Sequence, residues 1–207
     1  MIPNWLLWAR ELQASAQSGL AYAESPYDRE RYKNLQALAA RMMAEGSGEP
    51  AGLVEGVFAR QQGYATPKVD VRGAIFRGRE VLLVSEKIDG GRWTMPGGFA
   101  DVNDTPSAAV IREVAEEAGI VVTVKKLCAV FDRDKRGNTV PHPFHIYKLL
   151  FLCEEVGRCE KSDLETGEPR FFSLDDLPEL SVARTQPWQL ECLYRHFQDP
   201  SLPTDFD

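Results

Sequence analysis

The sequence predicts an α/β protein of the α+β type, in which a small all-helical domain precedes a domain with a mixed sheet. Apolar residues recur at helical spacing up to about residue 60, whereas β-branched runs separated by turn residues follow Pro67. A length of 207 residues leaves room for one larger domain and a short accessory domain. We therefore expect a helical domain over residues 1–64 and a mixed domain over residues 65–207.

Three amphipathic helices are expected in the first domain. Apolar residues repeat on one side of the ranges 4–18, 28–44 and 50–62. A glycine follows each range and is expected to end the helix, because glycine readily adopts the left-handed conformation of a helix C-terminus. These glycines are Gly19, Gly46 and Gly63.

The second domain is expected to mix strands and helices along the chain. The β-rich runs 69–76 and 81–84 flank the turn-like Arg77-Gly78-Arg79 and predict a hairpin. Further strands are expected near 121–131, 144–153 and 170–173, and helices over 106–118 and 186–197. The tail from Asp199 contains two prolines and three aspartates and is expected to fray.

The overall charge disfavours some classes of partner. A formal net charge of -7 argues against a surface that coats nucleic acid, because neutralising phosphates requires an excess of lysine and arginine. The apolar segment from Trp5 to Trp8 is too short for a signal peptide or a membrane span. We expect neither a nucleic-acid partner nor a membrane.

The cysteine pattern indicates the compartment. The four cysteines form no Cys-x-x-Cys pair and lie in or beside apolar segments, so buried free thiols are expected rather than zinc ligands or disulfides. They are Cys128, Cys153, Cys159 and Cys192. Free thiols fit best with a reducing cytoplasm.

Three carboxylates share one face of the helix expected over 106–118. Glu113, Glu116 and Glu117 stand at positions i, i+3 and i+4. Like charges at this spacing repel one another unless a cation is present, and hard divalent ions such as Mg²⁺ or Mn²⁺ prefer oxygen ligands. A solvated acidic face is the commoner explanation of such a run on its own.

The residues around these glutamates form a longer pattern of fixed spacing. Gly97 and Gly98 precede a loop, Pro106 opens the helix and Arg112 stands next to the first glutamate. The segment resembles the Nudix box, Gly-x5-Glu-x7-Arg-Glu-(apolar)-x-Glu-Glu-x-Gly-(apolar). Each fixed position matches except Asp104, which stands where the family has glutamate.

The resemblance implies an αβα sandwich with a loop-helix-loop site for a divalent metal ion, Mg²⁺ or Mn²⁺. By analogy, Glu116 and Glu117 would be metal ligands, and Glu113 would be a third ligand or activate the attacking water. Arg112 would orient a glutamate through a charge-assisted hydrogen bond.

The loop before the helix also takes expected roles from the resemblance. Gly97 and Gly98 would let the backbone approach the metal and the phosphates closely. Asp104 keeps the carboxylate of the family residue but loses a methylene, which puts only its reach in question. Water would be the nucleophile, without a covalent intermediate.

Resemblance outside the box indicates the substrate class. The segment Trp5-Leu-Leu-Trp-Ala-Arg-Glu-Leu-Gln-Ala is similar to the helical extension of bacterial hydrolases of X-linked nucleoside diphosphates. Asp132-Arg-Asp-Lys135 and Pro141-His-Pro-Phe-His145 resemble the subgroup that includes CDP-choline pyrophosphatases. The implied substrate is CDP-choline, ADP-ribose or a similar compound.

Basic residues gather after the helix with the three glutamates. A loop that faces phosphate would use them, whereas the alternative is a solvated turn between two strands. They are Arg133, Lys135, Arg136, His142 and His145.

The N-terminal helices offer more apolar surface than they can cover among themselves, with Trp5, Trp8 and Leu12 on the first of them. We expect a homodimer through this segment, and the second domain is the alternative partner for it.

Two functions stay open: a hydrolase, and a catalytically weak nucleotide-binding sensor module on the same fold. The intact glutamates favour the hydrolase.

Overall fold

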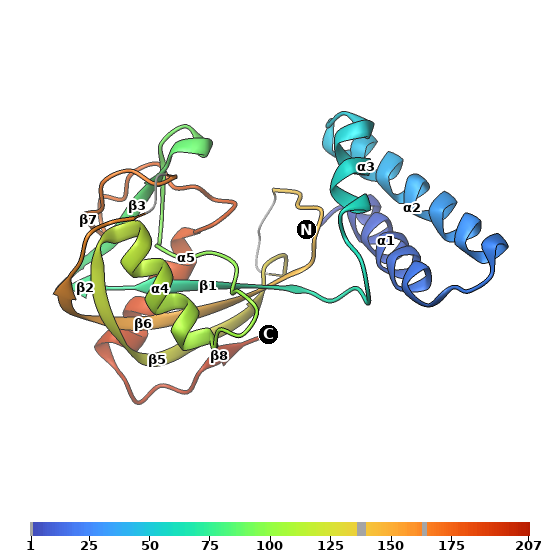
Figure 1. Ribbon diagram of the computed structural model, residues 1–207. Helices are drawn as coiled ribbons and strands as arrows, with labels where there is room; N and C mark the ends of the chain where they lie inside the picture. Colours follow the sequence, from blue (N-terminus) through green and yellow to red (C-terminus); the bar gives the residue numbers. More distant parts are fainter. Residues whose placement is uncertain (1, 136–139, 163–164) are drawn as a thin grey trace. The chain divides into compact units, whose positions relative to one another are not determined.

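The computed structural model describes residues 2–135, 140–162 and 165–207 (Figure 1), so Arg136 lies outside the described residues. The contacts divide the chain into two compact units. Residues up to Lys68, together with the segment 140–145, form the helical unit, and the rest of the described chain forms the second unit. From the sequence, the boundary was expected at 64/65 and residues 140–145 were expected in the second domain.

The helical unit consists of α1 (Asn4–Tyr22), α2 (Pro26–Ser47) and α3 (Ala51–Ala59). Small side chains line the contact between α1 and α2, which lets the two helices approach closely, while Phe58 of α3 is fully buried against them. The core of this unit comprises Leu6, Ala9, Ala39, Ala40, Met43, Ala44, Val54 and Phe58.

Two of the three glycines expected to end helices lie inside them instead. A Cβ atom on Gly19 would lie 2.3 Å from the ring of Tyr32, and one on Gly46 would lie 2.2 Å from the ring of Trp5. These positions accommodate aromatic rings of a neighbouring helix, so the glycines serve packing. The helix α2 ends at Gly48, whose φ of 78° is left-handed.

The second unit contains two four-stranded sheets (Figure 1). The first has the order β1-β6-β5-β8, with β1 (Lys68–Ala74), β6 (Ile146–Arg158), β5 (Ile120–Asp132) and β8 (Asp205–Phe206). In the second, β3 pairs with β2, β4 and β7; the bounds are β2 (Phe76–Arg77), β3 (Glu80–Glu86), β4 (Arg92–Thr94) and β7 (Arg170–Ser173). The antiparallel pairing of β2 with β3 confirms the expected hairpin.

Two helices cover opposite sides of the first sheet, α4 (Pro106–Ala118) and α5 (Pro187–Gln198) (Figure 1). The range expected for α4 is confirmed. It could be predicted from the sequence because neighbouring residues set both ends of the helix. Thr105 caps the first turn by accepting a hydrogen bond from the Ala108 amide, and Gly119 closes the last turn with a φ of 62°. Among the described helices, none is both long and apolar enough to cross a membrane.

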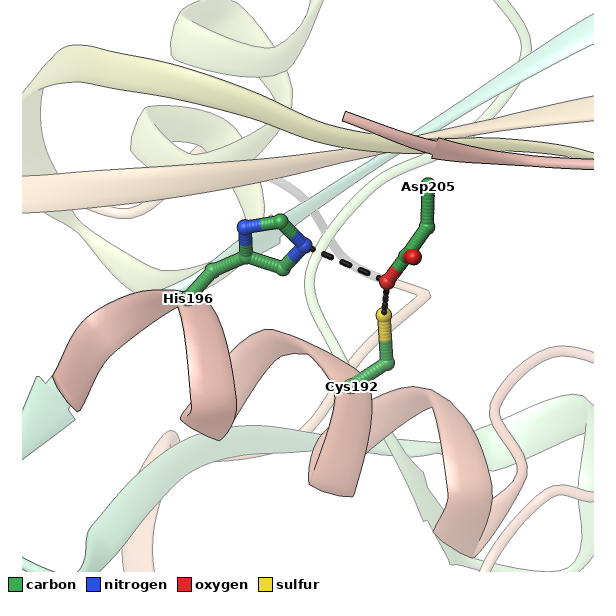
Figure 2. A group of neighbouring side chains, drawn as sticks. All are labelled: Cys192, His196 and Asp205. Atoms are coloured by element: carbon green, nitrogen blue, oxygen red, sulfur yellow. Dashed lines mark hydrogen bonds and ion pairs between the residues drawn. The ribbon is translucent and has the colours of Figure 1, made fainter. Parts of the chain in front are cut away.

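The C-terminal tail was expected to fray, and this expectation is wrong. Its residues Asp205 and Phe206 pair in parallel with β5. The Asp205 carboxylate also contacts α5, where it accepts a hydrogen bond from Cys192 Sγ at 3.1 Å and lies 3.3 Å from Nε2 of the buried His196 (Figure 2). Long-range contacts therefore hold a segment whose composition alone indicates a frayed end.

The described cysteines carry free thiols, as expected. Cys128, Cys153 and Cys192 are buried as expected. The expectation that Cys159 is also buried is wrong, because this residue lies just beyond the end of β6 and is exposed.

Candidate active site

Arg112 links the glutamates of α4 to each other. Its Nη1 atom lies 3.0 Å from Glu113 Oε1 and 3.0 Å from Glu116 Oε2. Nε donates to Asp104 Oδ2 at 3.2 Å, and Nη2 lies 3.2 Å from Asp101 Oδ2. A single guanidinium thus ties the preceding loop to the carboxylate face of α4, and the shorter side chain of Asp104 reaches it.

The third glutamate is held by the glycine loop. The amide of Gly97 donates to Glu117 Oε2 at 2.8 Å. Gly97 has a φ of 141°, and an added Cβ atom would lie 2.1 Å from the carbonyl oxygen of Val71, so only glycine fits. A Cβ atom on Gly98 would lie 3.0 Å from the carboxylate of Glu113. Gly98 therefore leaves the space over Glu113 clear of a side chain, and Gly97 lets the loop pass close to the backbone of β1.

The electrostatics of this face favour a cation. Burial raises the pKa of Glu117 to about 8, against the opposing charge of Arg72. The neighbouring carboxylates of Glu113 and Glu86 raise it further. Burial also raises the pKa of Glu113. Carboxylate oxygens that are gathered and partly desolvated beside the space left by Gly98 fit a hard divalent metal ion.

A buried ion network that was not predicted from the sequence adjoins the glycine loop. Arg72 donates to both oxygens of Asp70, at 3.0 and 2.8 Å, and Lys148 Nζ lies 3.0 Å from Asp70 Oδ1. Burial by itself would raise the pKa of Asp70, but the two cations outweigh it and lower the pKa to about 2. Arg72 also donates to the carbonyl of Met95 at 3.1 Å, which fixes the backbone that leads into Gly97.

Glu86 is a further residue near the site that was not predicted from the sequence. It lies at the end of β3, its side chain is almost fully buried, and its Oε1 lies 3.2 Å from Nε of Arg184. The available signal was an acidic residue two positions after the apolar strand run 81–84. That signal is weak, because most acidic residues at strand ends are solvated.

The described basic loop residues are divided between the two units. Arg133 is buried and pairs with Asp134 at 2.9 Å, whereas Lys135 is exposed; both belong to the second unit. His142 and His145 belong to the helical unit. There the carbonyl of His142 accepts hydrogen bonds from Arg10 at 3.0 and 2.6 Å, and that of His145 accepts one from the Lys68 amide at 2.9 Å.

Two family models match the chain. Residues 3–58 match a model described as a UDP-X-like, N-terminal oligomerisation domain, and residues 66–195 match the NUDIX domain, which alone covers more than half of the chain. The chain belongs to the Nudix hydrolase family. It has the mixed α/β fold that the resemblance implied, and this Nudix enzyme is a pyrophosphohydrolase.

The similar curated proteins include the Bacillus subtilis protein YjhB, whose name assigns it provisionally to the ADP-ribose pyrophosphatases. It is 39% identical over 204 residues, which cover 99% of this chain and 97% of that protein. An ADP-ribose pyrophosphatase from Methanocaldococcus jannaschii is 34% identical and covers 57% of this chain and 69% of its own length.

Solved structures give the same relationship. A crystal structure of an ADP-ribose pyrophosphatase from Streptococcus suis is 36% identical, with a TM-score of 0.62, and covers 69% of this Nudix chain and 100% of its own. A crystal structure of a UDP-X diphosphatase is 29% identical, also with a TM-score of 0.62, and covers 99% of this chain and 98% of its own.

Proposed function

We propose that this Nudix protein hydrolyses the pyrophosphate bond of a nucleoside diphosphate linked to another group, with a divalent cation and with ADP-ribose as the preferred substrate. The observation that carries the proposal is the carboxylate face of α4, where Arg112 holds Glu113 and Glu116 and the Gly97 amide holds Glu117. The named activities of its relatives support ADP-ribose before CDP-choline or a UDP-linked compound.

The cation is Mg²⁺ or Mn²⁺, and Glu113, Glu116 and Glu117 would hold it. When bound, it supplies charge neutralisation of the diphosphate and a bound water of lowered pKa. The oxygen donors of α4 and the space that Gly98 leaves over Glu113 fit this role.

The residues of the chain position and orient the reacting groups. Arg112 is a positioning residue, because it sets the side-chain conformations of Glu113 and Glu116. Water attacks one phosphorus, a new P–O bond forms and the bridging P–O bond breaks. With ADP-ribose the products are AMP and ribose 5-phosphate.

Lys135 is exposed in the second unit, and we propose that it contributes to binding of the phosphates.

A coupled phosphatase assay tests the proposed activity. ADP-ribose, CDP-choline and a UDP-sugar are incubated with the full chain and alkaline phosphatase, which acts only on the monoester products. We expect phosphate release that requires Mg²⁺ or Mn²⁺ and is fastest with ADP-ribose. Binding of these compounds without any release would instead identify a nucleotide sensor and contradict the hydrolase.

We also propose that the helical unit forms a homodimer. Leu7, Trp8 and Leu53 are 46%, 55% and 58% exposed, which leaves large apolar side chains on the surface of a small unit. The matching family model describes an oligomerisation domain over the same residues.

Buried free thiols fit a reducing compartment, and we propose the cytoplasm as the location.

A further inference from the structure

A polar cavity of about 270 Å³ lies within the helical unit. Its wall combines α1, the segment that follows α3 and the segment 143–145. The side chains that matter for its chemistry are Arg10, Gln13, Lys68, Phe144 and His145. The volume lies just below the usual range for ligand pockets, roughly 300–1,000 Å³, and suits a ligand no larger than a mononucleotide.

Gln13 lines this cavity with an amide that lacks hydrogen-bond partners. Its side chain is only 5% exposed, and neither Nε2 nor Oε1 has a partner among the described residues. Buried amides in folded proteins are almost always paired, because an unpaired buried donor or acceptor is unfavourable. Gln13 therefore carries a buried donor and a buried acceptor without partners among the described residues, in a side chain that contributes to the cavity wall.

The charge of the wall has one sign. Arg10, Lys68 and His145 contribute basic groups, and none of the residues described as lining the cavity is acidic. This contrasts with the net charge of -7 of the chain. Lys68 Nζ lies 3.0 Å from Gln61 Oε1 and 5.3 Å from the centre of the Phe144 ring. The wall therefore favours an anion that also carries an aromatic group.

We propose that this cavity is a binding site for a mononucleotide. Lys68 attracts the phosphate, the paired donor and acceptor edge of a base meets the Gln13 amide, and the Phe144 ring offers a stacking surface. A glutamine amide matches the adjacent donor and acceptor of adenine, and bases stack on aromatic side chains. The proposal does not depend on the hydrolytic activity, because every residue of the cavity belongs to the helical unit.

Calorimetric titration of the full chain with AMP tests the proposal, in EDTA so that metal-dependent binding elsewhere is suppressed. We expect saturable binding that Gln13→Leu and Lys68→Met each weaken about tenfold or more. Lys33→Met is the matched control, because Lys33 is an exposed lysine of the same unit. Glu117→Gln controls for the α4 carboxylates, and both controls should bind AMP as the unchanged chain does.

Several results would overturn the proposal. One is the absence of binding at about 5 mM AMP, a concentration at which even very weak binding would be detected. The others are unchanged affinity for AMP in both cavity variants, and loss of AMP binding in Glu117→Gln. Inorganic phosphate that binds as tightly as AMP would exclude a mononucleotide as the ligand class. If Gln13→Leu unfolds, Gln13→Glu keeps the size of the side chain and replaces the amide by a carboxylate, so binding should still be lost.

Discussion

Nε2 of the fully buried His196 lies 3.3 Å from Oδ2 of Asp205, and the contact connects α5 to the last strand of the chain (Figure 2). The same oxygen accepts hydrogen bonds from Cys192 Sγ and Arg195 Nη2, each at 3.1 Å. Three donors therefore converge on one carboxylate oxygen, and they explain why a tail rich in proline and aspartate is ordered.

Replacing this carboxylate should loosen the C-terminal strand. We expect Asp205→Ala to lower the free energy of unfolding by about 2 kcal/mol, because hydrogen bonds to a charged group are lost. Urea unfolding followed by circular dichroism measures the change. Glu191→Gln, at an exposed position of α5, is the control and should have little effect. Equal stability of Asp205→Ala and the unchanged chain would refute the anchoring role.

Loss of one carboxylate of α4 should abolish most of the turnover. We expect Glu116→Gln and Glu117→Gln each to lower kcat by about two orders of magnitude or more, because a lost metal ligand removes several kcal/mol of transition-state stabilisation. The assay uses ADP-ribose with Mg²⁺, and circular dichroism checks the fold. The exposed Glu55→Gln should keep full activity. Near-normal rates in both site variants would show that the site lies elsewhere.

Restoring the family residue at position 104 should be tolerated. Asp104 already reaches Arg112, with Oδ2 at 3.2 Å from Nε, so the longer side chain of Asp104→Glu should keep this contact. We expect kcat/KM to stay the same or to rise slightly, whereas Asp104→Asn should lower it by weakening the ion pair. A large loss in Asp104→Glu would mean that the loop backbone has adapted to the shorter side chain.

The buried network makes stability sensitive to acid. The pKa of Asp70 in the folded chain is about 2, below the value of about 3.9 expected when unfolded. The contribution of the ionised Asp70 carboxylate to the free energy of unfolding is therefore complete above about pH 4. This contribution is lost as the pH falls from about 4 to 2.

The matching variant is Asp70→Asn, which leaves Arg72 and Lys148 buried without their carboxylate. We expect a loss of about 3 kcal/mol at pH 7, and the difference from the unchanged chain should shrink toward pH 2. Urea unfolding at several pH values measures it. Asp175→Asn, which breaks an exposed pair with Arg79, should change stability little at any pH. A difference that is the same at pH 7 and pH 2 would contradict the assigned pKa.

Self-association should depend on the exposed apolar residues of the helical unit. We expect the full chain to sediment as a dimer at micromolar concentration, and Trp8→Gln with Leu53→Gln to shift it toward the monomer. Ile88→Gln, an exposed apolar residue of the second unit, is the control. A monomeric full-length chain would defeat the proposal, and a dimer that persists in a shortened chain from Thr66 would place the interface in the second unit.

The sequence alone predicted features that depend on neighbouring residues. The helix over Pro106–Ala118 agrees with the structure, because Thr105 and Gly119 set its ends locally and periodicity sets its buried face. The family likewise follows from the fixed spacing around Arg112, which was visible before any fold was known. The assignment of Glu113, Glu116 and Glu117 as metal ligands stays a prediction.

Only the tertiary structure decided features that need a partner distant in sequence. Glycine is common at the ends of helices, and Gly19 and Gly46 were expected there for that reason. Instead, aromatic rings on another helix occupy the space that a side chain at these positions would fill. Asp70 meets Lys148 across 78 positions, and Arg10 meets the carbonyl of His142 across 132. Local propensity carries no information about such pairs, because their energy arises only when folding brings the two segments together and removes both from water.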